Sequence, residues 1–168
     1  MLKTPAEKHQ LNIRLERFNM YNSTVNYILL SPSSKAPIRG SEQAAGWDLS
    51  ADLEGKTHIT ILPGEYKKIS SGIGIELPEG TFGALYPRSG MATKRGLVLA
   101  NGTGIIDSDY RGPLLVAIKN TSNELQIIEH GERIAQLVVT PYCPVIFNQV
   151  DSIGTTARGE GGFGSTGK

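Results

Sequence analysis

From Val25 onward, short apolar segments are interrupted about every 8 to 12 residues by Gly, Pro, Asn or Ser. This spacing is typical of an all-β sandwich or barrel, because each segment suits one strand and each interruption supplies turn residues. So many short segments argue against a parallel sheet covered by helices. We expect strands at residues 25–30, 47–51, 58–62, 66–70, 74–77, 82–86, 97–100, 114–118, 125–128, 134–139 and 145–150.

Length, charge and cysteine content restrict the kinds of partner. The 168 residues suit one domain, and a net charge of +1 gives no overall field that would attract nucleic acid. The longest apolar run, Leu114 to Ile118, is far shorter than the roughly 20 residues of a membrane span. From the charge and the short apolar runs, we expect no stable binding to nucleic acid or to a membrane. A single cysteine, Cys143, excludes an internal disulfide, so we expect a reducing compartment.

The N-terminal segment reads differently from the rest. Thr4 to Glu7 has the residues of a helix start, with a capping Thr, a Pro and an acid, and predicts a short helix over 5–19. The alternation of apolar residues in the same stretch also allows a strand. We treat 1–22 as an extension that packs on its own domain, stays mobile or docks on a protein partner.

The last ten residues contain five glycines around one aromatic side chain, Phe163. Such a composition does not form a stable helix or strand alone. One interpretation is a disordered end. The other is a mobile segment that closes over an anionic, aromatic ligand with Arg158 and Phe163.

Residues 87–90, Pro-Arg-Ser-Gly, follow an expected strand and precede a plausible helical turn at 91–95. The free N–H groups at such a helix start attract phosphate oxygens, and Arg88 adds a planar pair of donors. An ordinary turn is the alternative.

Two tight reversals lie close together, at 101–104 and at 107–110. A hairpin with a glycine-flanked mouth exposes backbone groups that can pair with the edge of a nucleobase. We expect Ile105 and Ile106 to shield Asp107 partly from water, which favours a proton acceptor. An Asp that only caps its own turn is the alternative.

Two further segments read first as structural. Arg133, in the sequence Gly-Glu-Arg-Ile-Ala-Gln, suits a surface ion pair. Trp47 suits a core position, and Asp48 beside it suits a turn.

Taken together and in order, AAGWDLSAD, PRSGMA, NGTGIIDSDYRG, GERIAQLVV and RGEGGFGSTG resemble the five motifs of the trimeric dUTPase family. The resemblance covers about 25–168, and Trp47 departs from the smaller or phenolic residue more usual in the family. It implies a jelly-roll-like β-domain at 23–157 and a flexible tail at 158–168. The tail would close a neighbouring active site in a homotrimer, in the cytoplasm, or in the host cytoplasm or nucleus for a viral gene.

The resemblance also implies the chemistry. The substrate is dUTP, and the products are dUMP and pyrophosphate. This reaction limits uracil incorporation into DNA and supplies dUMP for dTMP synthesis. Asp107 matches the general base, and Mg²⁺ is held mainly by triphosphate oxygens. Asp48 matches the acid of the first motif, which supports the site or contacts the metal through water. Substrate binding is implied for Arg88, Ser89, Gly90, Asn101, Gly104, Ile105, Ile106, Tyr110, Gln136, Arg158, Phe163, Gly164 and Ser165.

Two other functions compete with this interpretation. A dCTP deaminase of the same superfamily carries a catalytic Glu where this chain has Ala117, and a methyl group cannot transfer protons. A regulatory or decoy protein would keep the nucleotide pocket and act through 1–22, but the intact Asp107, Arg88 and Phe163 argue against a pocket without catalysis.

Deleting Gly159 to Lys168 tests the role of the tail. We expect hydrolysis of dUTP to be crippled while the melting temperature stays almost unchanged, because a glycine-rich end contributes little to the core. Turnover and thermal unfolding of the full and truncated chains measure both effects. A large fall in melting temperature would show that the tail is structural.

Overall fold

The computed structural model describes residues 24–162. The predicted all-β class is confirmed: twelve strands and one short helix, α2 (Ser89–Arg95), make up the described part. The helix proposed at 5–19 lies outside these residues. The strands are β1 (Asn26–Leu29), β2 (Ile38–Arg39), β3 (Trp47–Ser50), β4 (His58–Ile61), β5 (Tyr66–Ser70), β6 (Ile73–Glu76), β7 (Thr81–Tyr86), β8 (Leu97–Leu99), β9 (Gly104–Ile106), β10 (Leu115–Asn120), β11 (Gln126–Glu129) and β12 (Arg133–Pro141).

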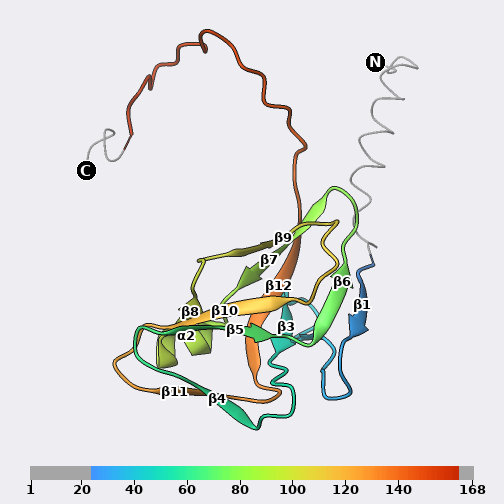
Figure 1. The fold of residues 1–168 in the computed structure, drawn as a ribbon. Helices are drawn as coiled ribbons and strands as arrows, with labels where there is room; N and C mark the ends of the chain where they lie inside the picture. Colours follow the sequence, from blue (N-terminus) through green and yellow to red (C-terminus); the bar gives the residue numbers. More distant parts are fainter. Residues whose placement is uncertain (1–23, 163–168) are drawn as a thin grey trace.

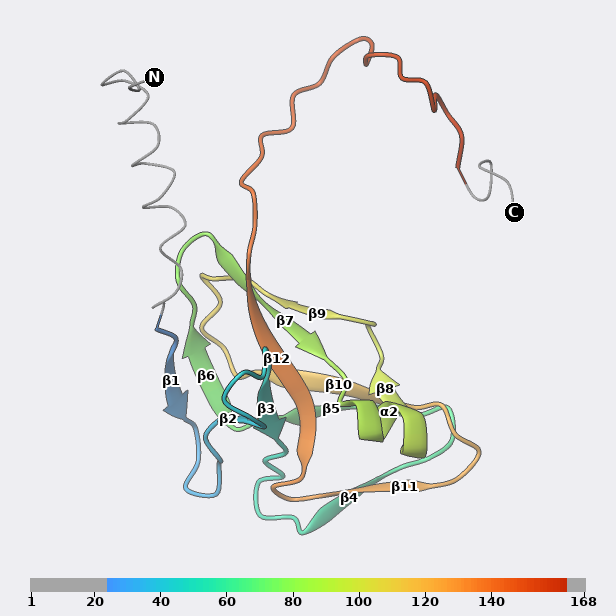
Figure 2. The ribbon, with the colours of Figure 1, turned by 180° about the vertical axis from the view of Figure 1, so that it is seen from behind.

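The strands form four antiparallel sheets, which Figures 1 and 2 show from opposite sides. The largest has the order β2-β3-β12-β7-β9, and a second has the order β5-β10-β8. Two pairs, β1-β6 and β11-β4, complete the fold. Their inner faces share one core of aliphatic side chains, among them Leu49, Ile61, Leu114, Ile128 and Ile134, each at most 1% exposed. The alternation of apolar residues that predicted the strands supplies these inner faces.

One predicted strand, at 145–150, is wrong. Residues 142–150 have no regular secondary structure, and the side chains of Ile146 and Phe147 are 96% and 97% exposed. In both views the chain leaves the sheets after β12 and runs away from them (Figures 1 and 2). The segment has strand-forming residues, but no strand lies beside it within 24–162 to take its backbone hydrogen bonds. We call residues 142–162 the C-terminal arm.

Trp47 is also not a core residue, contrary to the sequence interpretation. It lies on β3 with its side chain 43% exposed, and the guanidinium of Arg39 lies 5.6 Å from the centre of its ring. Asp48 is on the same strand rather than in a turn. Because neighbouring strand residues point to opposite faces, Trp47 and Asp48 serve different surfaces of the sheet.

No helix within residues 24–162 has the length and apolar character needed to cross a membrane.

A buried carboxylate ties the loop after β1 to the body of the domain. Asp52 is 5% exposed and accepts hydrogen bonds from the hydroxyls of Ser31, Ser33 and Ser34, at 2.5, 3.0 and 2.7 Å. Burial raises the pKa of Asp52, but these bonds and one from the Glu54 N–H outweigh it and lower the pKa from 3.8 to about 2. The charged form is therefore the one that the fold stabilises.

Asp52 makes folding dependent on acid pH. A carboxyl whose pKa is lower in the folded chain stabilises it fully above the unfolded pKa of 3.8, and this contribution is lost as pH falls toward 2. We expect Asp52→Asn to lower the free energy of unfolding at pH 7 by about 2 kcal/mol and to flatten its dependence on pH between 4 and 2. Urea unfolding across this range measures both effects.

Asp151→Asn is the matched control, because Asp151 is exposed on the C-terminal arm. Equal acid sensitivity in the Asp52→Asn variant and the wild type would contradict the assignment.

Candidate nucleotide site

The turn after β7 has the geometry predicted from residues 87–90. Arg88 has extended backbone angles and caps α2, which begins at Ser89, so the predicted helical turn is confirmed. No side chain caps the first turn of this helix by a hydrogen bond within the described residues. A Cβ placed on Gly90 would meet nothing within 4 Å. The backbone in front of Ser89 and Gly90 is therefore open to a ligand.

Asp48 orients two arginines beside this turn. Its Oδ1 lies 3.2 Å from Nε of Arg88, and its Oδ2 lies 3.0 Å from Nη1 of Arg133. The Asp48 side chain is only 14% exposed. The expected surface pair of Arg133 is confirmed, and its partner is the carboxylate that also holds Arg88.

Gln136 joins the same cluster from β12. Its Nε2 donates to the carbonyl oxygen of Pro87 at 3.1 Å. Gly46 makes room for it, since a Cβ there would lie 2.9 Å from Oε1 of Gln136. Three of the sequence motifs thus meet at one place, which we call the arginine turn: Asp48, Pro87 to Gly90, Arg133 and Gln136.

The segment from β8 to β9 reverses at 101–104, as predicted. Gly102 has φ +72°, and its N–H donates to the carbonyl of Leu99 at 3.1 Å. The two strands do not form a hairpin with each other, however, because β8 pairs with β10 and β9 pairs with β7. The reversal is a corner between two sheets rather than the expected hairpin.

This corner still offers backbone groups to a ligand. Within 24–162, β9 is an edge strand whose one neighbour is β7. The outer edge of Gly104, Ile105 and Ile106 carries N–H and C=O groups that no described strand pairs with. The exposed Asn101 lies in the turn that leads into this edge.

The next turn places an acid and an aromatic ring together. The Tyr110 N–H donates to the carbonyl of Asp107 at 3.1 Å, and the Tyr110 hydroxyl donates to the carbonyl of Pro113 at 3.0 Å. The Tyr110 side chain is 41% exposed.

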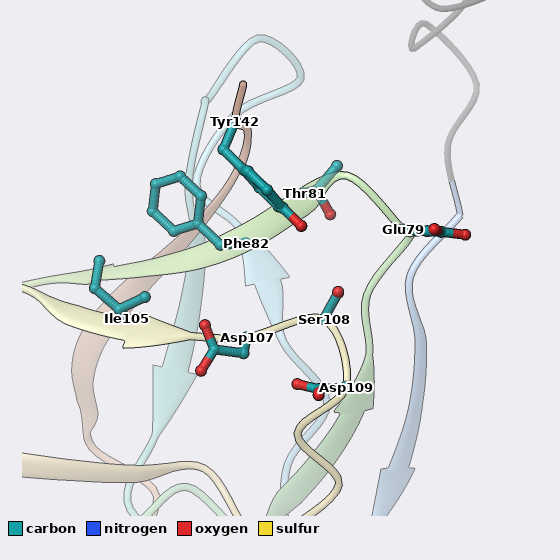
Figure 3. Close-up of a pocket in the computed structure, with 8 residues that line it drawn as sticks. All are labelled: Glu79, Thr81, Phe82, Ile105, Asp107, Ser108, Asp109 and Tyr142. Atoms are coloured by element: carbon teal, nitrogen blue, oxygen red, sulfur yellow. The ribbon is translucent and has the colours of Figure 1, made fainter. Parts of the chain in front are cut away.

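Asp107 lines an open pocket of about 770 Å³, shown in Figure 3. Phe82, Ile105 and Tyr142 form its apolar walls, and Thr81, Ser108, Glu79 and Asp109 line the rest. Asp107 itself is exposed, so the expected shielding by Ile105 and Ile106 is wrong for the single chain. These two isoleucines lie on the strand before Asp107 and do not cover its carboxylate. Sequence reasoning missed Phe82 and Tyr142, which only the register of β7 brings to Asp107.

The arginine turn and Asp107 lie at opposite ends of β7. Asp107 shares its pocket with Phe82 near the start of the strand, whereas Arg88 follows its last residue, Tyr86. Tyr86 lies four residues after Phe82 on the strand, a distance of about 13 Å. One chain therefore does not bring the predicted base to the predicted phosphate turn.

The tail residues are placed only in part. Arg158 is exposed on the C-terminal arm, where its Nε donates to the carbonyl of Gly161 at 2.8 Å. Phe163, Gly164 and Ser165 lie outside the described residues. Among residues 24–162, no group of three or more His, Cys, Asp or Glu side chains is arranged to hold a metal ion.

An all-β domain with an arginine-rich turn and an open strand edge for a base has the features of a nucleotide-binding protein. The family model for dUTPase matches residues 33–167. A deoxyuridine 5'-triphosphate nucleotidohydrolase from Desulfitobacterium hafniense is 45% identical over 150 residues, which is 89% of this chain and 98% of that protein.

Solved structures agree. A mutant dUTPase of Staphylococcus bacteriophage 80alpha with dUpNHpp has a TM-score of 0.78 at 31% identity, over 88% of this chain and 100% of that one. A mutant dUTPase from phage phi11 of S. aureus, described for its coordination of a structural Mg(II) ion, has a TM-score of 0.69 at 27% identity. The match covers 79% of this chain and 99% of that one. The chain belongs to the dUTPase family.

Removing the shared carboxylate tests the arginine turn. We expect Asp48→Ala to lower the free energy of unfolding by about 1 to 3 kcal/mol, because Arg88 and Arg133 would then face each other without a common acceptor. Urea unfolding measures the change. Glu42→Ala, at an exposed acid in the preceding loop, is the control. Equal effects of the two substitutions would mean that Asp48 does not organise the turn.

Proposed function

We propose that this chain hydrolyses dUTP to dUMP and pyrophosphate. Membership of the dUTPase family, a relative named as the nucleotidohydrolase and a neighbour with the dUTP analogue dUpNHpp support the proposal. The observation that carries it is the segment 101–110, which presents an open strand edge, an exposed carboxylate and a fixed tyrosine ring in succession.

The edge of β9 recognises the base by hydrogen bonds. Backbone groups of Gly104, Ile105 and Ile106, with the amide of Asn101, match the donor and acceptor pattern of uracil. Cytosine presents a different pattern and would leave buried polar groups unpaired, which is worth a factor on the order of 10⁴ to 10⁵. The methyl group of thymine would collide with the close backbone.

Asp107 carries out the chemistry. Its carboxylate accepts a proton from a water molecule, the water oxygen forms a bond to the α-phosphorus, and the bond from that phosphorus to the bridging oxygen breaks. The electron pair leaves with pyrophosphate, and dUMP is the other product.

The arginine turn holds the phosphates. Arg88, the backbone at Ser89 and Gly90, and Gln136 bind the chain, with Ser89 near the bridge between the first two phosphates. Arg158, Phe163, Gly164 and Ser165 complete the site from the tail, with Phe163 stacked on uracil and Arg158 and Ser165 at the terminal phosphate.

Magnesium fits this site through the triphosphate rather than through a protein cluster. Both oxygens of Asp48 already face arginines, so Asp48 suits contact through a metal-bound water and not direct coordination. Bound in this way, Mg²⁺ would neutralise charge that develops on the phosphate oxygens. The structural Mg(II) ion of the phi11 relative supports a role for this metal.

A homotrimer with shared sites explains the separation of Asp107 from the arginine turn. A neighbouring copy can bring its own arginine turn to Asp107, which a single chain does not do. The C-terminal arm exposes Val145, Ile146, Phe147, Val150 and Ile153. β1 exposes Tyr27, Ile28 and Leu29 on a sheet of two strands. Exposed apolar segments of this kind favour burial against other copies.

Deamination, a partner role of residues 1–22 and the cellular compartment are the remaining questions of function. Ala117 lies on β10 and offers no proton-transferring group for deamination. A partner role of 1–22 stays a prediction, beside hydrolysis rather than in place of it. A reducing compartment, the cytoplasm, or the host cytoplasm or nucleus for a viral gene, stays a prediction that rests on the single Cys143.

Turnover of four nucleotides tests the function. By the family resemblance, the ring of Tyr110 lies against the deoxyribose, where the 2′-hydroxyl of a ribose would project. With Mg²⁺, we expect pyrophosphate from dUTP and little from dCTP, dTTP or UTP, because only dUTP fits both the edge of β9 and the ring of Tyr110. Asp107→Asn should lower turnover by roughly 10² to 10⁴ and keep nucleotide binding and the trimer. Pyrophosphate and ammonia release, calorimetric binding of dUpNHpp and sedimentation measure these outcomes.

Ammonia from dCTP would select the deaminase instead. Near-normal turnover of Asp107→Asn would remove Asp107 from its role and leave the substrate assignment intact.

A further inference from the structure

The side chain of Tyr110 is held from two directions by residues just after it. Its hydroxyl donates to the carbonyl of Pro113 at 3.0 Å. From the other direction Gly112 lies against the ring: a Cβ on Gly112 would be 2.3 Å from the hydroxyl oxygen and 2.6 Å from Cζ of Tyr110. Either distance is far inside normal contact, so any other residue at 112 would displace the ring.

The requirement for glycine at 112 comes from this contact and not from the backbone. Gly102 has a φ of +72°, a conformation that favours glycine, whereas Gly112 has no positive φ. The three atoms nearest to an added Cβ all belong to the Tyr110 ring. Alanine at 112 is therefore compatible with the turn and incompatible with the position of the ring.

The acceptor of the Tyr110 hydroxyl is itself fixed to the core. Leu114, which follows Pro113, is fully buried and its N–H donates to the carbonyl of Ile73 at 2.9 Å. The Leu114 carbonyl accepts from both the N–H and the hydroxyl of Ser71, each at 2.9 Å. These bonds of Leu114 to Ile73 and Ser71 fix the peptide that carries the Pro113 carbonyl, so the hydroxyl of Tyr110 bonds to an acceptor of fixed position.

The ring also shares its turn with the proposed base, through the bond from the Tyr110 N–H to the Asp107 carbonyl at 3.1 Å. Arg111 adds two bonds within the turn, to the carbonyls of Ser108 at 2.7 Å and of Tyr110 at 3.0 Å. The position of the ring relative to Asp107 is therefore set locally.

We propose that Gly112 is a positioning residue for sugar selection: by holding the Tyr110 ring in place, Gly112 and the Pro113 carbonyl determine how strongly the site rejects a 2′-hydroxyl. The proposal rests on the proposed function, in which the ring lies against the deoxyribose. Because the hydroxyl of Tyr110 donates its proton to Pro113, it has no proton to donate to the sugar, and the proposal assigns the sugar contact to the surface of the ring. A displaced ring leaves space for a ribose.

Gly112→Ala tests the proposal. We expect the ratio of kcat/KM for dUTP to that for UTP to fall by about 10-fold or more, the usual worth of a steric contact in a pocket. The melting temperature should change little, because the backbone at 112 accepts alanine. Gly40→Ala is the matched control, since a Cβ there meets nothing within 4 Å, and it should keep the wild-type ratio.

A double-mutant cycle separates positioning from a general effect on the turn. In a Tyr110→Ala background the ring is gone, so adding Gly112→Ala should leave the dUTP to UTP ratio unchanged. A merely structural role of Gly112 would instead lower kcat and stability equally in both backgrounds, and that result would overturn the proposal.

The two proposals fail differently. If the wild-type chain does not prefer dUTP to UTP, the proposed function itself is wrong. If the wild type is selective and Gly112→Ala stays equally selective, only the positioning role is wrong.

Discussion

The antiparallel pairing of β7 positions the arginine turn, the edge of β9 and Asp107 relative to one another. On one side β12 brings Gln136 and, through β3, Asp48 to the end of β7, where Arg88 follows. On the other side β9 runs antiparallel to β7 and carries Asp107 back to its start. Because a strand is rigid, the chain cannot fold these two ends together. In the proposed mechanism, different copies therefore supply the carboxylate of Asp107 and the arginine turn to one substrate, and assembly becomes part of that mechanism.

Local signals predicted most of the fold, and pairing decided the rest. Strands such as β5 and β7 were predicted to within a residue, because alternating apolar side chains and flanking turn residues lie within the segment itself. The segment 145–150 carries the same signals and forms no strand, because a strand also needs a neighbour, and none within 24–162 is available. The segment that forms β9 was likewise interpreted as one side of a hairpin, because its sequence does not reveal which strand it pairs with. Its sequence shows the reversal, but not that its partner is β7 rather than β8.

The site shows the same limit. The resemblance grouped the motifs, and the structure brings Asp48, Arg88 and Gln136 together as that grouping implies. It does not bring Asp107 to them. Nor did the sequence show why particular glycines are needed, since Gly46 and Gly112 have no unusual backbone conformation. Their need arises from side chains that fold against them, Gln136 and Tyr110, and such contacts have no local signature. Trp47 is similar: a large aromatic residue in an apolar strand suggests the core, but the face that it occupies is exposed.

Asp52, Asp48 and Asp107 differ in what surrounds their carboxylates, and this difference explains why neither Asp52 nor Asp48 suits the role of a base. Asp52 accepts bonds from three hydroxyls and a backbone N–H, and a carboxylate whose pKa is near 2 takes up a proton poorly. Both carboxylate oxygens of Asp48 are already engaged by the guanidinium groups of Arg88 and Arg133, so this side chain has a structural role. The carboxylate of Asp107 accepts no hydrogen bond from any residue in the described part of the chain and faces an open pocket (Figure 3). In the proposed trimer, a neighbouring copy and the bound nucleotide would cover this pocket and exclude bulk water from it, so the proposed proton acceptor would be enclosed only when the substrate is in place.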